Sequence, residues 1–405
     1  MALVHHRIGD PGDFLSYGAE AYEKIPVDRF NVHTFICSAV GQVVTDTGAF
    51  LKNIDVFDPT EFGITSKDGR LMNVGTRKLL ESTFLALLES GINYRGRNVG
   101  CYMSAVAHDM FSVSGHDDTE ARGAFSGGPS MVANRVSYHL DLRGPTVPLD
   151  TACSSTLYAT HLAVQASRHG ECEAAVVGGC QVDHRFTEWL MYSQGGILSP
   201  DGKCKPFDAS ADGFGRGEAV VSIVLKPLDA ALRDHDKIYA TILGTGVNSS
   251  GSLAPVNAPV ASAQQDAMLR AFAQARRSPQ DVDFIELHAT GTASGDPTEA
   301  NWVGARFGRD TELLVGSVKG NIGHTEITAF LASLCKVCHI IERGVILPTV
   351  NLSVPNPAIR WEEYKMRVPV APEKLIVRSP SGRALIAMSS SGIGGQTRIS
   401  GACGG

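Results

Sequence analysis

Short apolar runs alternate with longer amphipathic segments along most of the 405-residue chain. Several short runs consist of Val, Ile, Leu and Ala, which is typical of strands covered on both faces. We predict strands at residues 99–104, 174–177, 220–226, 238–244, 284–288, 313–318 and 384–388. We predict helices at residues 77–89, 154–169, 261–275 and 325–342. This alternation predicts an α/β protein built from βα units.

A change in composition near Asp234-His-Asp-Lys separates two such series of elements. We therefore predict two α/β halves, residues 1–233 and residues 234–405. Glycine is the one unusual component. Its 43 residues exceed a tenth of the 405-residue chain, whereas glycine makes up about 7% of an average protein. These glycines are spread over strand–helix junctions, which indicates tight turns rather than low-complexity tracts.

Charge and composition exclude several classes of protein. The formal net charge is −6, so no general positive field favours nucleic acid, and we expect no such partner. The N-terminus lacks the apolar run of a secretory signal, and no window approaches about 18 apolar residues, so we expect no membrane partner. Nine scattered cysteines suit reduced thiols, and we expect a cytoplasmic location.

Cys335 and Cys338 form a single C-x-x-C within an apolar helical run. Such pairs occur in redox and metal sites, but no second Cys or His pair lies nearby. Cysteine is also among the residues most often buried. We therefore predict that both sulfurs pack in the core, and we expect no metal site.

Cys153 follows an apolar stretch and directly precedes the predicted helix at 154–169. A sulfur at a helix N-terminus lies near free backbone N–H groups and the positive end of the helix dipole. This position predicts a lowered thiol pKa and a thiolate nucleophile. The alternative is that Cys153 is one more small buried residue.

Two histidines occupy matching positions where predicted strands end. His288 precedes a Gly/Thr loop, and His324 closes the turn Lys319-Gly-Asn-Ile-Gly-His324 before a helix. Residues at the carboxyl ends of strands commonly line the site of an open α/β sheet, so both are candidate partners of a nucleophile. Lys319 would keep a nearby imidazole neutral, able to donate its N–H to an oxyanion. Alternatively, Lys319 is a surface lysine paired with Glu326.

Motifs for several other chemistries are absent. Gly244-Thr-Gly246 begins like a dinucleotide-binding loop, but Ser249 stands where the last glycine belongs. The sequence contains no phosphate-binding G-x-x-x-x-G-K-[ST], no H-E-x-x-H and no G-x-S-x-G. Nucleotide, zinc and serine-hydrolase chemistry therefore have no support in the sequence.

The remaining motifs together resemble the β-ketoacyl synthase (ketosynthase) domain of type I polyketide and fatty-acid synthases. The resemblance rests on Asp150-Thr-Ala-Cys153-Ser-Ser, His288-Ala-Thr-Gly-Thr and Lys319-Gly-Asn-Ile-Gly-His324, in that order and spacing. It covers about residues 14–397, nearly the whole chain. The stretch Gly295-Asp-Pro-Thr-Glu-Ala-Asn-Trp and the ending Ser390-Ser-Gly-Ile-Gly-Gly are most similar to iterative fungal polyketide synthases.

The resemblance implies a thiolase-like fold, with two related α/β halves in a five-layered αβαβα arrangement, and a homodimer. It implies that Cys153 accepts an acyl group from a carrier-protein thioester. His288 and His324 would then hold a malonyl thioester and promote the loss of CO2, and Lys319 would tune and position them. The enolate would attack acyl-Cys153 in a decarboxylative Claisen condensation, as in polyketide and fatty-acid biosynthesis.

The resemblance also implies how the substrates are bound. The backbone N–H groups of Cys153 and Ile393 would form an oxyanion hole. Thr290 and Thr292 would hydrogen-bond the phosphopantetheine arm of the substrate, and Ile393 and Gly394 would border the acyl chain. We expect no bound cofactor, because the substrates are themselves phosphopantetheine-linked acyl and malonyl thioesters, and we expect a carrier protein or carrier domain as partner.

The chain departs from the family pattern at both ends. Residues 1–13 lack the apolar opening strand of the family, Ile393 stands where a gating Phe is common, and Ser391 replaces another Phe. These changes bear on the length of the acyl chain that the site accepts and on the identity of the acyl acceptor. Two alternatives therefore stay open: an acyltransferase to an alcohol or amine, and a non-catalytic partner subunit. The chain is expected to be a stand-alone enzyme or a domain of a larger synthase.

Overall fold

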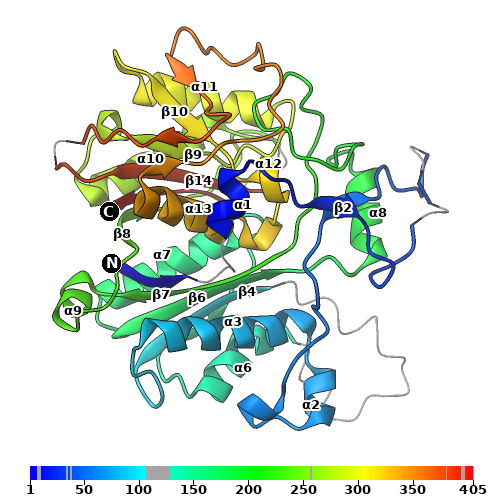
Figure 1. Cartoon of the computed structure of the whole chain (residues 1–405), viewed down its shortest axis with the longest axis vertical. Coiled ribbons are helices and arrows are strands. Elements are labelled where there is room, and N and C mark those ends of the chain that lie inside the picture. The colour runs from blue at the N-terminus through cyan, green and yellow to red at the C-terminus, as the bar shows by residue number, and fades with distance from the viewer. Residues whose placement is uncertain are drawn as a thin grey trace.

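The computed structural model describes residues 1–6, 11–32, 35–36, 39–105, 128–255, 258–379, 381–393 and 397–404. Figure 1 shows helices and sheet strands of these residues alternating in layers. Two helix layers lie on the outside, one sheet region follows inside each of them, and a helix layer lies between the two sheet regions. This is the αβαβα order that the resemblance implies.

The first sheet region belongs to the N-terminal part of the chain. Its strands are β4 (Val99–Ala105), β5 (Thr146–Pro148), β6 (Ala174–Gln181) and β7 (Ala219–Lys226). β4 is parallel to both β5 and β6, and β7 is antiparallel to β6. Alternate residues of β6 point to opposite faces, so both faces are packed: Val176 joins the outer helices, and Val177 joins the central helix layer. The outer helices are α3 (Val74–Ser90) and α6 (Met131–Leu140).

The second sheet region belongs to the C-terminal part. β9 (Phe284–Glu286) lies between β10 (Leu313–Gly316) and β14 (Leu385–Gly392) and is parallel to both. The strands β12, β15 and β8 extend this region, at Met366–Arg367, Thr397–Gly404 and Ala240–Gly246. The outer helices α10 (Ala261–Ala275) and α11 (Gly295–Phe307) pack on its other face. Because β9, β10 and β14 are parallel, their carboxyl ends meet at one edge, and that edge carries the site.

The N-terminal segment corrects one expectation from the sequence. Although residues 1–13 lack the apolar opening motif, Ala2–His6 form strand β1, which pairs antiparallel with β7 and with β8. β1 thereby joins the two sheet regions into one order, β12-β10-β9-β14-β15-β8-β1-β7-β6-β4-β5. Leu3 has no exposed surface in the central core. Backbone pairing on both sides and the buried Leu3 therefore help to hold this segment where the usual apolar run is missing.

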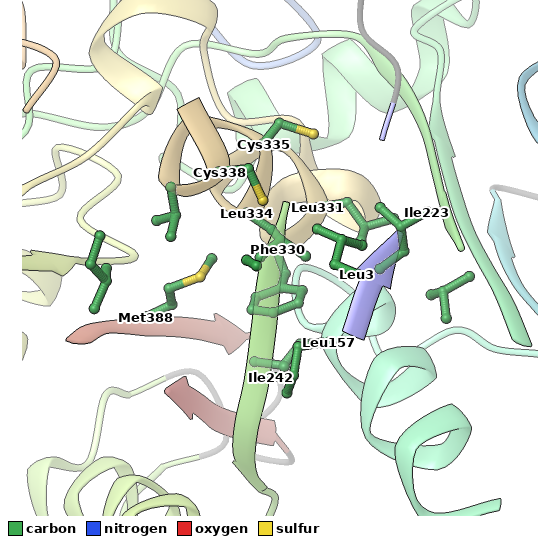
Figure 2. Packing of buried hydrophobic residues seen from close by; sticks show 14 of the residues in the cluster. Leu3, Leu157, Ile223, Ile242, Phe330, Leu331, Leu334, Cys335, Cys338 and Met388 are labelled. Atoms are coloured by element: carbon green, nitrogen blue, oxygen red, sulfur yellow. The ribbon is translucent and has the colours of Figure 1, made fainter. Parts of the chain in front are cut away.

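The central helices are α7 (Ser155–Arg168) and α13 (Ala329–Arg343). Figure 2 shows Cys335 and Cys338 of α13 among the buried apolar side chains of the central core. Leu157 of α7 and Met388 of β14 belong to the same cluster. The predicted core packing of the C-x-x-C pair is confirmed. Among the described residues, no group of three or more His, Cys, Asp or Glu side chains is arranged to hold a metal ion.

Each predicted strand and helix overlaps an observed one, and the helix predicted at 261–275 is α10. The helix predicted at 325–342 begins later, because its first turn is the 3-10 segment η3 (Glu326–Thr328) and Glu326 has φ 37°. The other elements are α1 (Pro11–Ser16), β2 (Tyr22–Lys24), β3 (Thr47–Ala49), η1 (Thr60–Phe62), α2 (Ser66–Leu71), α8 (Phe186–Gln194), α9 (Leu228–Arg233), η2 (Pro279–Asp281), α12 (Lys319–Ile322), β11 (Val345–Ile346) and β13 (Glu373–Lys374).

The division into halves at residues 233 and 234 stays a prediction. Within the described ranges, none of the helices combines the length and the apolar character that a bilayer crossing requires.

Candidate active site

Cys153 lies in a tight loop between β5 and α7, one residue before the N-cap Ser154. The loop is held by its own side chains: Ser154 Oγ donates to Thr151 O at 2.7 Å, and Ser155 Oγ donates to Ala152 O at 2.6 Å. Ala152 has φ 53°, a left-handed conformation that non-glycine residues rarely adopt. Ser390 of β14 donates to Cys153 O at 2.9 Å, which ties the loop to the second sheet region. The sulfur is thus presented from a strained turn that side-chain hydrogen bonds hold in place.

The environment of the thiol differs from the prediction. Burial, and after it the nearby carboxylate of Glu326, raise the pKa of Cys153 to about 12. Backbone N–H groups of Ile393 and Cys153 and the charge of Lys319 act in the opposite direction but do not prevail. The predicted lowering of the thiol pKa is therefore wrong, because desolvation outweighs the backbone N–H groups and the charge of Lys319. Cys153 needs a base to act as a nucleophile.

His288 follows β9, and its backbone is fixed from two sides. The His288 N–H donates to Glu299 Oε1 and to Ser389 Oγ, both at 3.1 Å. The next N–H, that of Ala289, donates to Glu299 Oε2 at 2.9 Å. Glu299, on α11, thus clamps the end of β9 and sets the direction in which the partly buried His288 ring leaves the strand.

His324 lies between α12 and η3, and its ring meets that of His288. The two ring centroids are 5.2 Å apart, with an interplanar angle of 90°. Burial lowers the pKa of His324 well below its ordinary value, and the positive charges of Lys319 and Arg216 add to this effect. The imidazole is therefore neutral at physiological pH, as the sequence predicted from Lys319, although burial is the larger cause and Arg216 was not foreseen.

Lys319 is 2% exposed, so the alternative of a surface lysine paired with Glu326 is wrong. Glu326 pairs instead with Arg216, at 2.9 Å. Burial lowers the pKa of Lys319, and the charges of Glu286 and Glu299 oppose that shift. Lys319 does not line the cavity. It lies behind the histidines as a buried source of positive potential.

A cavity of about 440 Å³ brings most of the predicted site residues together. Its lining includes Cys153, His288, Thr290, Thr292, His324 and Ile393. A second hollow, of about 740 Å³, lies over residues 352–370, and its lining contains no cysteine or histidine. We therefore assign the chemistry to the smaller cavity.

The residues predicted to bind the substrate lie on two separate segments of the chain. Thr290 and Thr292 stand on the loop after His288, and the Thr290 hydroxyl donates to the Thr292 hydroxyl at 3.5 Å. Ile393 is 53% exposed and borders the cavity, with its backbone N–H directed at the Cys153 sulfur. Gly394 lies outside the described residues. The geometry is consistent with an oxyanion position between the N–H groups of Cys153 and Ile393.

The sequence did not single out the polar wall beside Cys153. Tyr192 on α8 and Glu326 line the cavity, and the Tyr192 hydroxyl donates to Glu326 Oε2 at 2.9 Å. Behind them lies Arg216, which is 1% exposed. One signal was available: an arginine followed by a glutamate in the glycine-rich run Phe214-Gly-Arg-Gly-Glu, directly before an apolar strand. Buried charges of this kind are rare unless they are paired.

A thiol and two imidazoles facing one cavity between stacked α/β halves define an acyl-transferring enzyme with a cysteine nucleophile. Family models support a more specific assignment. The β-ketoacyl synthase N-terminal domain matches residues 10–231, and the β-ketoacyl synthase C-terminal domain matches residues 239–353. The chain belongs to the β-ketoacyl synthase family. It is a ketosynthase domain, an acyl-transferring condensing enzyme with the thiolase-like fold.

Relatives and solved structures agree with this assignment. The chain is 57% identical over 381 residues to a highly reducing polyketide synthase of Strobilurus tenacellus, covering 94% of this chain and 14% of that protein. It is 38% identical over 394 residues to a reducing polyketide synthase of Gibberella moniliformis, covering 95% and 16%. The ketosynthase from module 6 of the bacillaene synthase of Bacillus subtilis 168 superposes with a TM-score of 0.91 at 29% identity, covering 100% of this chain and 71% of that one. The chain thus spans about one seventh of its first polyketide synthase relative.

Proposed function

We propose that this chain joins an acyl group on Cys153 to a malonyl thioester by decarboxylative Claisen condensation in polyketide biosynthesis. The observation that carries the proposal is the shared cavity: the Cys153 sulfur, the perpendicular rings of His288 and His324, and the Ile393 N–H all face it. Each group has a distinct task in a two-stage reaction.

In the first stage, the Cys153 thiol attacks an acyl thioester. The thiol proton passes to a neighbouring imidazole and the new S–C bond forms. The bond between the acyl carbon and the carrier sulfur then breaks, and the carrier thiol leaves after it is protonated. The tetrahedral intermediate places its oxyanion between the N–H groups of Cys153 and Ile393. Each such donor lowers the barrier by about 3–4 kcal/mol in comparable acyl transfers.

In the second stage, His288 and His324 donate N–H to the thioester carbonyl of the malonyl group. The bond to the carboxylate breaks, CO2 leaves, and the electron pair forms an enolate that the two donors stabilise. The enolate carbon attacks acyl-Cys153, the sulfur leaves as thiolate and is reprotonated, and a β-ketoacyl thioester remains on the carrier. A neutral His324 suits this role because it holds its proton throughout.

The substrate's phosphopantetheine arm is assigned to Thr290 and Thr292, which line the cavity. We assign the acyl and malonyl groups to a carrier protein or carrier domain, and no bound cofactor is needed. A homodimer and a cytoplasmic location also form part of the proposal. The first rests on the family, and the second on the scattered cysteines of the sequence.

Intact mass spectrometry of the chain with an acyl thioester mimic tests the proposal. Cys153 should gain the acyl mass, Cys153→Ala should not, and malonyl-carrier should then yield a product two carbons longer. Transfer of the acyl group to an alcohol or amine without CO2 release would instead support an acyltransferase. Absence of any acylation would contradict both enzymes and leave the non-catalytic partner subunit.

A further inference from the structure

Arg216 is a buried cation beside the site that the proposed mechanism does not use. Its side chain is 1% exposed, and three carboxylates surround it: Asp183 at 2.7 Å, Glu326 at 2.9 Å and Glu188 at 3.4 Å from Nη2. The guanidinium also lies against aromatic rings, 4.8 Å from the centroid of Tyr192 and 5.2 Å from that of Trp189. Arginine presents a planar fork that suits such multiple pairing. Its position is therefore fixed on nearly every side.

The backbone around Arg216 is bonded to that of His324. The His324 N–H donates to Gly215 O at 2.7 Å, and the Gly217 N–H donates to His324 O at 3.1 Å. A Cβ on Gly217 would lie 2.0 Å from Ile322 O, so only glycine permits this close approach. Both backbone groups of His324 are thus held by the residues that flank Arg216. A shift of Arg216 would move His324 with it.

The ring of His324 has few other constraints. Among the described residues, no hydrogen-bond partner reaches its buried Nδ1. Phe214 meets the ring edge to face at 5.1 Å, and it too belongs to the loop that contains Arg216. On the other side, Arg216 holds Glu326, two residues beyond His324, through Nε at 3.0 Å. The loop of residues 214–217 therefore grips His324 from both its backbone and its ring.

We propose that Arg216 is a positioning residue for His324, holding the imidazole in the orientation that malonyl decarboxylation requires. This inference rests on the proposed function. Its second component is electrostatic: the charge of Arg216 adds to burial and to Lys319 in lowering the pKa of His324. The titratable groups that line the cavity with His324 are Cys153, Tyr192, Asp212, His288, Asp296, Glu299 and Glu326, and the charges of Lys319 and Arg216 act on His324 from behind the lining. Of these, only Lys319 and Arg216 act on its pKa as cations.

The test compares Arg216→Gln with Arg216→Lys by 13C NMR of labelled histidine, with His324→Asn assigning the resonance. Without the positive charge, His324 should titrate at higher pH in Arg216→Gln, whereas Arg216→Lys should keep it neutral. In Arg216→Gln, kcat for malonyl decarboxylation should fall at least tenfold with KM changed less than threefold. Equal titration of His324 in wild type and both variants would overturn the inference.

Arg29→Gln is the matched control. Arg29 is also buried and paired with a glutamate, Glu218, at 3.2 Å, but it does not act on His324. Arg29→Gln should lower the free energy of unfolding without changing the pH at which His324 titrates. Where Arg216→Gln fails to fold, the double variant Asp183→Asn, Arg216→Gln also removes the nearest of the three carboxylates left without the arginine, and it carries the same prediction. The titration needs no turnover, so a wild type that neither acylates nor decarboxylates would refute the proposed function while Arg216 is still tested.

Discussion

The rings of His288 and His324 stand perpendicular, with centroids 5.2 Å apart, although one follows β9 and the other follows α12. Glu299 holds the backbone of the first, and Gly215 and Gly217 hold the backbone of the second. Two independently fixed donors can therefore converge on one oxygen. Such preorganisation costs no rearrangement during the reaction.

Replacing either histidine by alanine should slow malonyl decarboxylation by about 10²–10³-fold, because each substitution removes one of the two oxyanion donors. Quantification of CO2 released from malonyl-carrier measures the effect. Acylation of Cys153 at pH 9 should persist in at least one of the two variants, because acylation precedes decarboxylation and does not require both imidazoles. A loss of less than about threefold in both variants would argue against paired donors.

The Cys153 thiol should be slow to react at neutral pH. Because burial, and then Glu326, raise its pKa to about 12, its thiolate fraction grows about tenfold per pH unit between pH 7 and 9. Iodoacetamide alkylation, followed by intact mass, should show that slope without a plateau. Glu326→Gln should speed the reaction at fixed pH, as it removes a negative charge, and Cys153→Ala corrects for other cysteines. A plateau below pH 8 would show that the thiol pKa is lowered after all.

Lys336 on α13 and Glu286 on β9 form an ion pair at 2.8 Å with no exposed surface on either side chain. Lys336→Met should lower the free energy of unfolding by about 3–5 kcal/mol, because it leaves Glu286 buried without its cation. The double variant Glu286→Gln, Lys336→Met should recover more than half of that loss. Urea unfolding measures both. Equal losses in the single and double variants would mean that packing, not charge, makes the contribution.

Thr290→Val and Thr292→Val keep the shape of the side chain and remove the hydroxyl. If these hydroxyls bind the phosphopantetheine arm, KM for a carrier-linked substrate should rise several-fold, since a hydrogen bond contributes about 0.5–1.5 kcal/mol. Steady-state kinetics with a truncated thioester, which lacks most of the arm, provides the control and should change little. Equal changes for both substrates would contradict the assignment.

The strands β4, β6 and β9 were predictable because each is a short, mainly apolar run, and α10 was predictable because its longer sequence is amphipathic. Cys153, His288 and His324 were predictable because each follows a strand or precedes a helix within a distinctive motif. β1 was not, since its sequence lacks the usual apolar run and its pairing with β7 and β8 appears only in the assembled fold.

The thiol pKa and the Arg216 cluster could not be predicted for a different reason. Desolvation of Cys153 depends on residues brought together from several segments, among them Glu326 and Ile393. The carboxylates that pair with Arg216 lie on α8, on η3 and after β6, so far from it in the sequence that no local motif could indicate the pairing. Local patterns identify the reacting groups, whereas their electrostatics are a property of the assembled fold.

The most direct test follows a single turnover with malonyl-carrier labelled in its free carboxyl group. Acyl-loaded Cys153 should lose its acyl group, and one labelled CO2 should be released for each β-ketoacyl product formed, at matching rates. Labelled carboxyl retained in the product, or acyl loss from Cys153 with no CO2 release, would contradict decarboxylative condensation by this site.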